Sequence, residues 1–188
     1  AIASKRKLPV IQFDVKTAFL NGTLSEDIYM KMPPGSKQAE KVLKLHKSIY
    51  GLKQAANVWN KLLNASLLNA GFYQSKHDDC LYILREASAI IYAVCHVDDL
   101  LFATTNLKTL DEKVKFLNKS FTMKNLGQVE NYLGIEVTRD SEGVYSICQK
   151  KYIEKIADEY QLTDCKSSKY PMDPGYHKLV SDEPVESS

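Results

Sequence analysis

Residues 89–105 read AIIYAVCHVDDLLFATT and place two adjacent aspartates between two apolar segments. Short segments rich in β-branched and aromatic residues are typical of buried strands, and two residues between them are typical of a hairpin turn. Because a carboxylate buried without a partner costs free energy, Asp98 and Asp99 are expected together at a turn that reaches solvent. Aspartates suit turns without any further role, so this pattern alone leaves a purely structural interpretation open.

Asp14 adds a third carboxylate in a similar setting. The segment LPVIQFDV, residues 8–15, has the pattern of a buried strand, and Asp14 stands near its end. If this strand pairs with the 89–105 hairpin, the three aspartates converge. Hard divalent cations bind such oxygen clusters, and Mg²⁺ combines one or two carboxylates with water and substrate phosphates. The aspartates are therefore candidates for a two-magnesium site of the kind that transfers nucleotidyl groups.

The remaining hydrophobic pattern predicts an α+β fold. Apolar residues recur at helical spacing over 54–70, over 107–117 behind a cap at Thr105 or Asn106, and over 152–160. Further strands or hairpins are expected over 28–35, 42–50, 80–97, 100–105 and 131–147. This order of elements favours an antiparallel sheet with helices packed on one face.

Composition narrows the class of protein. The chain has 188 residues, 44% of them hydrophobic and 26% charged, and a net charge of +2, as in an ordinary soluble domain. Its longest apolar run, 89–95, is shorter than the roughly 20 residues of a membrane helix. No secretory leader is recognisable, and the start AIASKRK without Met indicates a piece of a longer polypeptide. Several clusters of lysines are compatible with a surface that binds the phosphate backbone of a nucleic acid, although a solvated surface is the simpler interpretation of any one cluster.

Other chemistries fit less well. Four widely spaced cysteines favour reduced thiols inside a cell: Cys80, Cys95, Cys148 and Cys165. A zinc site that combines two of these with His77 and His96 is disfavoured, because the adjacent Cys95 and His96 would point to opposite faces of a strand. The glycine motifs of phosphate-binding and dinucleotide-binding loops are absent, and so is the nucleophile elbow of serine hydrolases.

Five segments, in this order, resemble the reverse transcriptase of copia-type LTR retrotransposons: QFDVKTAFLNG, YMKMPPG, SIYGLKQAANVWN, HVDDLLFA and YLGIEV. The resemblance runs from about residue 8 to about residue 160. It implies a polymerase palm with partial fingers over 1–137, a thumb remnant over 138–165 and an extended or disordered tail over 166–188. It also implies an RNA-directed DNA polymerase that transfers nucleotides from dNTPs to a primer 3′-hydroxyl on an RNA or DNA template.

The resemblance implies roles for individual residues. Asp14, Asp98 and Asp99 match the catalytic aspartates that bind two Mg²⁺ ions, for which Mn²⁺ can substitute. Phe19 matches the aromatic residue that excludes a ribose 2′-hydroxyl. The positions that match nucleotide contacts are Val15, Lys16, Thr17, Ala18, Phe19, Tyr50, Gly51 and Gln54. The positions that match the primer grip are Tyr132, Leu133 and Gly134. Lys124 lies near the segment that supplies a general acid for pyrophosphate, although a solvated lysine is the simpler interpretation.

Departures from the family pattern keep two further hypotheses open. His96 stands where the family has Tyr, Ala56 and Asn57 replace a Pro-Arg pair, and the basic fingers segment would lie upstream. A retrotransposon-derived remnant that folds and binds nucleic acid without polymerising fits these departures. A different phosphoryl transferase on a similar palm fits less well, because it needs no template or primer motif.

The resemblance also implies partners and a location. Template–primer, dNTPs and the rest of a Pol polyprotein, including fingers and RNase H, are the expected partners, with no membrane. The expected location is intracellular, either in cytoplasmic virus-like particles or in the nucleus.

Overall fold

A computed structural model of the protein describes residues 1–38, 40–166 and 168–169. The chain divides into two compact units, residues 1–148 and 149–188. In the second unit the described residues include one amphipathic helix, α4 (Lys150–Glu159), at the position that the sequence predicts. The predicted tail over 166–188 lies outside the described residues except at 166, 168 and 169.

A six-stranded antiparallel sheet organises the first unit. Its strand order is β4-β5-β6-β7-β1-β8, so the N-terminal strand β1 lies between the aspartate hairpin and β8. The strands are β1 (Val10–Val15), β4 (Tyr73–Gln74), β5 (Leu81–Glu86), β6 (Ala89–His96), β7 (Asp99–Thr104) and β8 (Met123–Gln128). The antiparallel sheet that the sequence predicts is confirmed, including the pairing of the 8–15 segment with the hairpin.

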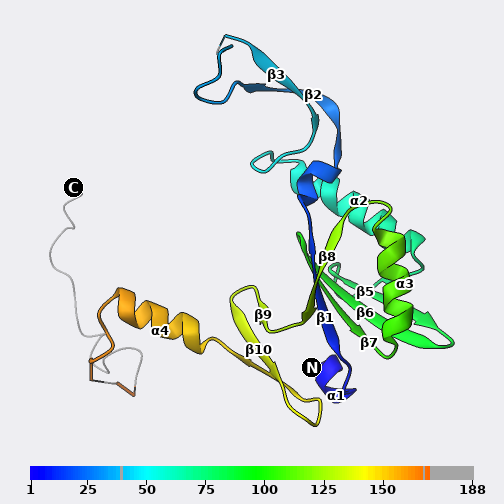
Figure 1. Ribbon diagram of the computed structural model, residues 1–188, viewed down its shortest axis with the longest axis vertical. Coiled ribbons are helices and arrows are strands. Elements are labelled where there is room, and N and C mark those ends of the chain that lie inside the picture. Colours follow the sequence, from blue (N-terminus) through cyan, green and yellow to red (C-terminus); the bar gives the residue numbers. More distant parts are fainter. Residues whose placement is uncertain (39, 167, 170–188) are drawn as a thin grey trace. The chain divides into compact units, whose positions relative to one another are not determined.

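Helices α2 (Ala55–Asn69) and α3 (Leu107–Leu117) pack on one face of this sheet (Figure 1). The Asn106 side chain caps α3 by accepting hydrogen bonds from two backbone N–H groups, of Lys108 and Thr109. The main core forms between helices and sheet and includes Phe13, Val15, Trp59, Leu63, Leu67, Leu100, Phe102, Leu110 and Leu117. This face of β1 therefore carries Phe13 and Val15, and alternation directs Asp14 to the opposite face.

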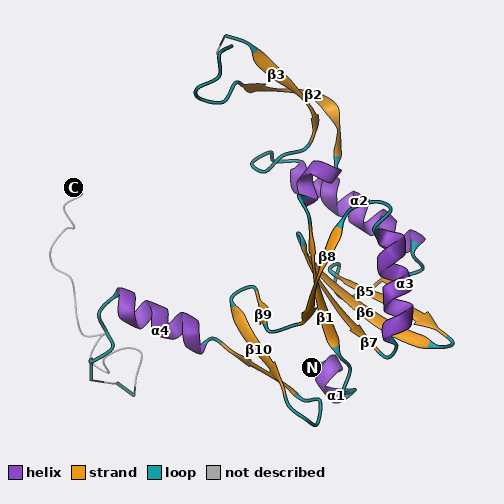
Figure 2. Ribbon diagram, viewed as in Figure 1, coloured by secondary structure: helices purple, strands orange, loops and turns teal. Residues whose placement is uncertain are grey.

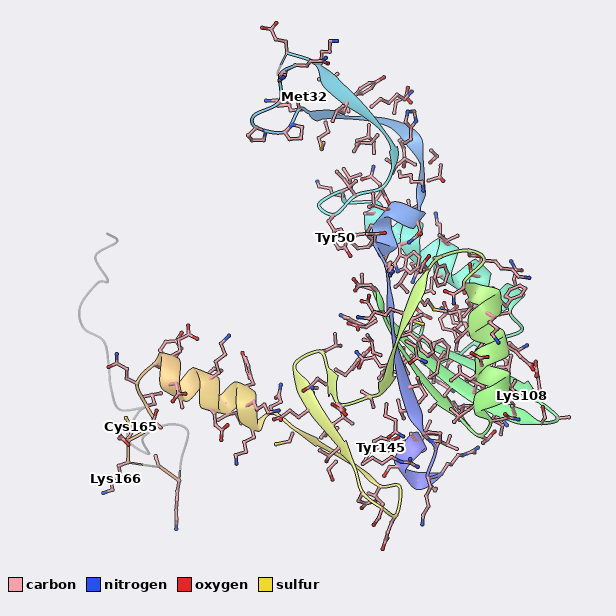
Figure 3. All side chains as sticks on the ribbon, viewed as in Figure 1. Met32, Tyr50, Lys108, Tyr145, Cys165 and Lys166 are labelled. Carbon is pink, nitrogen blue, oxygen red and sulfur yellow. The ribbon has the colours of Figure 1, made fainter. Side chains whose placement is uncertain are left out.

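The opposite face of the sheet carries a smaller apolar cluster. It includes Val10, Tyr92 and Ala103, and it is partly covered by a second sheet of β9 (Asn131–Tyr132), β10 (Ile135–Arg139) and β11 (Tyr145–Cys148). Tyr145, labelled in Figure 3, joins this sheet to the start of β1: its hydroxyl donates to the Leu8 carbonyl at 3.1 Å and accepts from Val10 N–H at 2.9 Å. The short helix α1 (Ile2–Lys5) contributes Ala3 to the same cluster.

A separate two-stranded ribbon forms between β1 and α2 in the sequence. It consists of β2 (Thr23–Lys31) and β3 (Val42–Lys47), and β2 follows the short 3-10 helix η1 (Ala18–Asn21), as Figure 2 shows. Ser48, fully buried, ties the end of the ribbon to η1 because its hydroxyl donates to the Phe19 carbonyl. Gly22 passes so close to α2 that a β-carbon there would lie 2.6 Å from a methyl group of Val58.

Two details differ from the sequence-based expectation. The segment 123–128 was not predicted as a strand, yet it pairs with β1 along its length as β8. The turn of the aspartate hairpin consists of Val97 and Asp98, so Asp99 is the first residue of β7 and not a turn residue. In the described part of the chain, no helix is both long and apolar enough to cross a membrane. The assignment of these elements to palm, fingers and thumb stays a prediction.

Candidate active site

Asp14 and Asp99 lie directly opposite each other on neighbouring strands. Asp14 is the penultimate residue of β1, and the antiparallel register pairs it with Asp99 at the start of β7. Opposed residues of antiparallel strands project from the same face, with Cα atoms roughly 4.5–5.5 Å apart. The register continues this row to His96 on β6 and Lys124 on β8. Four titratable side chains thus cross the sheet in one line, on the face that α2 and α3 leave free.

Asp98 lies beside this row, in the turn between β6 and β7. Its neighbour Val97 has a φ of +54°, which is unusual for a β-branched residue. Two hydrogen bonds hold the turn in place. Trp59 Nε1 donates to the Val97 carbonyl at 2.6 Å, and Val15 N–H donates to the Asp98 carbonyl at 2.8 Å. Helix α2 and strand β1 therefore fix the position of the turn.

Tyr50 connects the segment before α2 to the aspartate pair. Its hydroxyl donates to Asp98 Oδ2 at 3.1 Å, and its ring lies 4.4 Å from that of Phe19, measured between centroids (Figure 3 labels Tyr50). Desolvation, the hydrogen bond to Asp98 and the charges of Asp98 and Asp14 together raise the pKa of Tyr50 above 10. The hydroxyl therefore remains a donor at neutral pH.

Asp99 has two polar neighbours, Gln12 and Tyr132. Gln12 Nε2 donates to Asp99 Oδ1 at 3.3 Å. Among the residues that the structure describes, the buried Tyr132 hydroxyl has no hydrogen-bond partner. Burial first, and then the charge of the nearby Asp99, raise the pKa of Tyr132 to about 12. Tyr132 is thus close enough to Asp99 for the two groups to influence each other.

The three aspartates do not form a closed metal cage in this arrangement. Among the residues that the structure describes, no three His, Cys, Asp or Glu side chains gather closely enough to hold an ion. The Asp98 and Asp99 carboxylates instead accept hydrogen bonds from the neutral donors Tyr50 and Gln12. Mg²⁺ needs only one or two carboxylates together with water and phosphate oxygens. The opposed pair Asp14 and Asp99 therefore fits Mg²⁺ by its chemistry, with Asp98 adjacent.

The predicted nucleotide-contact positions lie in two segments, one from the end of β1 into η1 and one just before α2. The amides of Val15 and Lys16 are already donors inside the fold, to the carbonyls of Asp98 and Thr122. Thr17 has a φ of +48° and opens η1, which carries Ala18 and Phe19. Gly51 has a φ of +96°, and Gln54 precedes the first turn of α2. Of these positions, Phe19 and Tyr50 are in ring contact, and Tyr50 contacts an aspartate.

The predicted primer-grip residues form a tight hairpin. Tyr132 ends β9, Leu133 and Gly134 have φ values of +52° and +78°, and β10 begins at the next residue. Positive φ at both central residues is typical of a hairpin turn whose twist matches its strands. Of these residues, Tyr132 lies close enough to Asp99 for the charge of that carboxylate to help raise the pKa of its hydroxyl.

Trp59 and Gln12 were missed as site residues. Each contacts the aspartate hairpin across a long sequence separation, 38 residues for Trp59 and 87 for Gln12. To predict these two contacts, one would need to know how α2 packs on the hairpin and how β1 pairs with it. Trp59 is the single tryptophan of the chain, and its place on the apolar stripe of a helix indicates a core residue before it indicates a donor.

Comparison with known proteins decides the family. A family model described as reverse transcriptase (RNA-dependent DNA polymerase) matches residues 1–174. The chain belongs to the reverse transcriptase family. The family that the five sequence segments indicate is thereby confirmed, and the aspartate row lies inside the matched region.

Curated relatives of this reverse transcriptase domain are transposon proteins. The retrovirus-related Pol polyprotein from transposon RE1 of Arabidopsis thaliana is 35% identical over 176 residues, which are 92% of this chain and 12% of the relative. That from transposon TNT 1-94 of Nicotiana tabacum is 36% identical over 185 residues, 95% of this chain and 14% of the relative. A Saccharomyces cerevisiae protein named "Putative transposon Ty5-1 protein" is 36% identical over 162 residues, 85% of this chain and 53% of the relative. The domain thus spans about half of that protein and a much smaller share of the polyproteins.

Proposed function

We propose that this domain is an RNA-directed DNA polymerase that acts as part of a retrotransposon Pol polyprotein. The observation that carries the proposal is the pairing of Asp14 with Asp99 across β1 and β7, with Asp98 in the adjoining turn, in a chain of the reverse transcriptase family. Strand β1 is distant in sequence from β7 and its turn, and its pairing with β7 brings these carboxylates to one end of the sheet. Relatives named as Pol polyproteins support the larger context.

Asp14, Asp98 and Asp99 would hold the Mg²⁺ ions. When bound, such ions activate the primer 3′-hydroxyl and neutralise charge that develops on the phosphates. The protein supplies the rigid frame for this chemistry. Trp59 and the Val15 amide fix the turn that carries Asp98, and the β1–β7 ladder fixes the other two aspartates. Tyr50 holds the Asp98 carboxylate before the ions bind.

Substrate positions follow from the surroundings of the row. The aromatic pair of Phe19 and Tyr50 offers an apolar surface beside Asp98 for the deoxyribose of a dNTP. Lys124, exposed and opposite Asp14, offers a positive charge on the other side of the row, where pyrophosphate would leave. The hairpin of Tyr132, Leu133 and Gly134 would contact the primer end, and lysines would bind the phosphates of template and primer.

The larger assignments belong to the same proposal. In it, residues 1–137 serve as palm with partial fingers and 138–165 as a thumb remnant. Further fingers and RNase H would come from the rest of the polyprotein. Binding of a template–primer through lysines should weaken steeply as salt increases, because each phosphate contact releases counterions.

The test is primer extension on an RNA template with dNTPs, in Mg²⁺ and then in Mn²⁺. The wild-type domain is compared with Asp98→Asn and with Asp79→Asn, which makes the same change in an exposed loop. Loss of charge at a site that stabilises developing charge costs about 10²–10³-fold in rate or more. We expect extension by wild type and Asp79→Asn and at least that loss in Asp98→Asn.

The second hypothesis, a remnant that binds nucleic acid without polymerising, predicts a different result. It rests on His96 and on Ala56 and Asn57, which depart from the family pattern. In that case all three proteins would bind template–primer equally and none would extend it. Equal extension by wild type and Asp98→Asn would contradict the proposed catalytic role of the aspartate.

A further inference from the structure

Two cysteines face each other across the β5–β6 ladder. The register pairs Leu81 with Val94, so the next pair toward the active-site turn is Cys80 and Cys95. Cys80 lies in the turn just before β5, and the Cys95 N–H donates to its carbonyl at 3.0 Å, which holds the two residues opposite each other one step beyond the ladder. Both residues are thiols in the structure.

The two side chains project toward the same space. Alternation along β6 places Cys95 with Ala93 on the face covered by the helices, and Cys80, two residues before the core residue Tyr82, lines the same pocket as Tyr82 and Cys95. Both cysteines line one pocket of about 220 Å³, together with Trp59 of α2 and His96. Antiparallel partners have Cα atoms roughly 4.5–5.5 Å apart, within the 4.4–6.8 Å range of disulfides.

The two thiols differ in environment. Cys80 is exposed, whereas Cys95 is only 7% exposed. Burial, and then the neighbouring Cys80, raise the pKa of the Cys95 thiol to about 12. An oxidant from solvent therefore meets Cys80 first, because reaction follows exposure and thiolate character. Cys95 is placed to react second, from inside the pocket.

We propose that Cys80 and Cys95 are a redox site in which hydrogen peroxide produces a reversible intramolecular disulfide. The Cys80 sulfur attacks peroxide, the O–O bond breaks, and Cys80 becomes a sulfenic acid while one water leaves. The Cys95 sulfur then attacks the Cys80 sulfur, its proton and the hydroxyl of the sulfenic acid leave as a second water, and the S–S bond forms. The cysteines are oxidised by two electrons, and the peroxide is reduced to two waters.

The site lies next to the proposed catalytic turn. Cys95 is followed by His96 and then by the Val97–Asp98 turn, and Val97 lines the same pocket. A covalent link between Cys80 and Cys95 would therefore tie the end of β6 to the loop before β5, at the base of that turn. The proposal goes beyond the proposed function and does not depend on it, because the disulfide is detected without any polymerase assay.

The experiment uses the full chain with Cys148→Ser and Cys165→Ser, which removes the two cysteines outside the pair. The reduced protein is treated with stoichiometric hydrogen peroxide, its remaining thiols are alkylated in denaturant, and tryptic peptides are analysed by mass spectrometry. Trypsin cleaves after Arg85 and so separates the two cysteines. We expect one monomeric product that has lost two hydrogen atoms, a linked Cys80–Cys95 peptide pair, and full recovery of both thiols with dithiothreitol.

A matched variant, Cys80→Ser in the same background, changes an exposed side chain and leaves the buried Cys95 in place. It should keep one alkylatable thiol and yield no linked pair. The proposal is overturned if both thiols of the parent remain alkylatable, if Cys80 accumulates as sulfinic acid, or if the main product is a dimer linked between chains.

Discussion

Replacing Trp59 with Phe is expected to loosen the turn that carries Asp98. Trp59 is 2% exposed, and its indole N–H donates to the Val97 carbonyl at 2.6 Å. Phe keeps an aromatic ring beside Phe121, whose centroid lies 5.1 Å from that of Trp59, but it is smaller than Trp and has no donor. A carbonyl left without its partner in a partly buried place costs about 1–3 kcal/mol. We expect the free energy of unfolding to fall by at least that amount, because the smaller ring also leaves buried space in the core.

Urea denaturation followed by circular dichroism measures this change, because Trp59 is the only tryptophan and its fluorescence is lost in the variant. Amide hydrogen exchange of Val15 gives the local readout, since this N–H donates to the Asp98 carbonyl. In Trp59→Phe the Val15 amide should exchange faster than the global loss of stability explains.

Phe121→Leu is the control for Trp59→Phe. It removes the ring contact and keeps the indole donor, so Val15 exchange should change only with global stability. A free energy of unfolding of Trp59→Phe within about 0.5 kcal/mol of wild type, together with unchanged Val15 exchange, would contradict this prediction. In that case the hydrogen bond to Val97 does not hold the turn.

Three further predictions concern stability. Tyr145→Phe removes a hydroxyl that hydrogen-bonds to both the Leu8 carbonyl and the Val10 N–H. The free energy of unfolding, measured by urea denaturation, should fall by about 2–4 kcal/mol. A fall below about 0.5 kcal/mol would contradict this prediction. Val97→Gly removes the steric strain of a β-branched residue at φ +54°. This gain should exceed the extra conformational entropy that glycine loses on folding, so the free energy of unfolding should rise by up to about 1 kcal/mol. A clear decrease would show that Val97 is not strained. Burial raises the pKa of the Tyr82 hydroxyl to about 12. Above pH 10 the unfolded state therefore loses this proton before the folded state does, and the free energy of unfolding falls until about pH 12, by up to about 1.4 kcal/mol per pH unit. Urea denaturation of Tyr82→Phe should show a shallower fall over this pH range, and a pH profile equal to that of wild type would contradict the prediction.

Local patterns were sufficient for most elements of the fold. The spacing of apolar residues predicts α2 and α3, and Asn106 has the side-chain acceptor that a helix N-cap needs. Strand β8 could not be found in this way. Its sequence MKNLGQ has one buried residue, Met123, so it forms a strand through its pairing with β1 and not through its own pattern.

The candidate site likewise contains residues that local patterns predict and residues that they do not. Asp14, Asp98 and Asp99 could be found because each carboxylate interrupts or ends an apolar strand. The register of their hairpin was one residue off, because a β-branched Val97 in left-handed conformation is not expected at a turn. Trp59 holds that conformation from a helix 38 residues away, and no local pattern carries this information.

Titration with Mn²⁺, followed by ¹H–¹⁵N NMR of the uniformly labelled chain, tests the central proposal most directly. A bound Mn²⁺ ion broadens the amide signals nearest to it. We expect the signals of Asp14, Asp98 and Asp99 to broaden first, and we expect Asp14→Asn to largely abolish this effect. First broadening at the exposed acidic pair Asp78 and Asp79, with no change in Asp14→Asn, would contradict the proposed metal site.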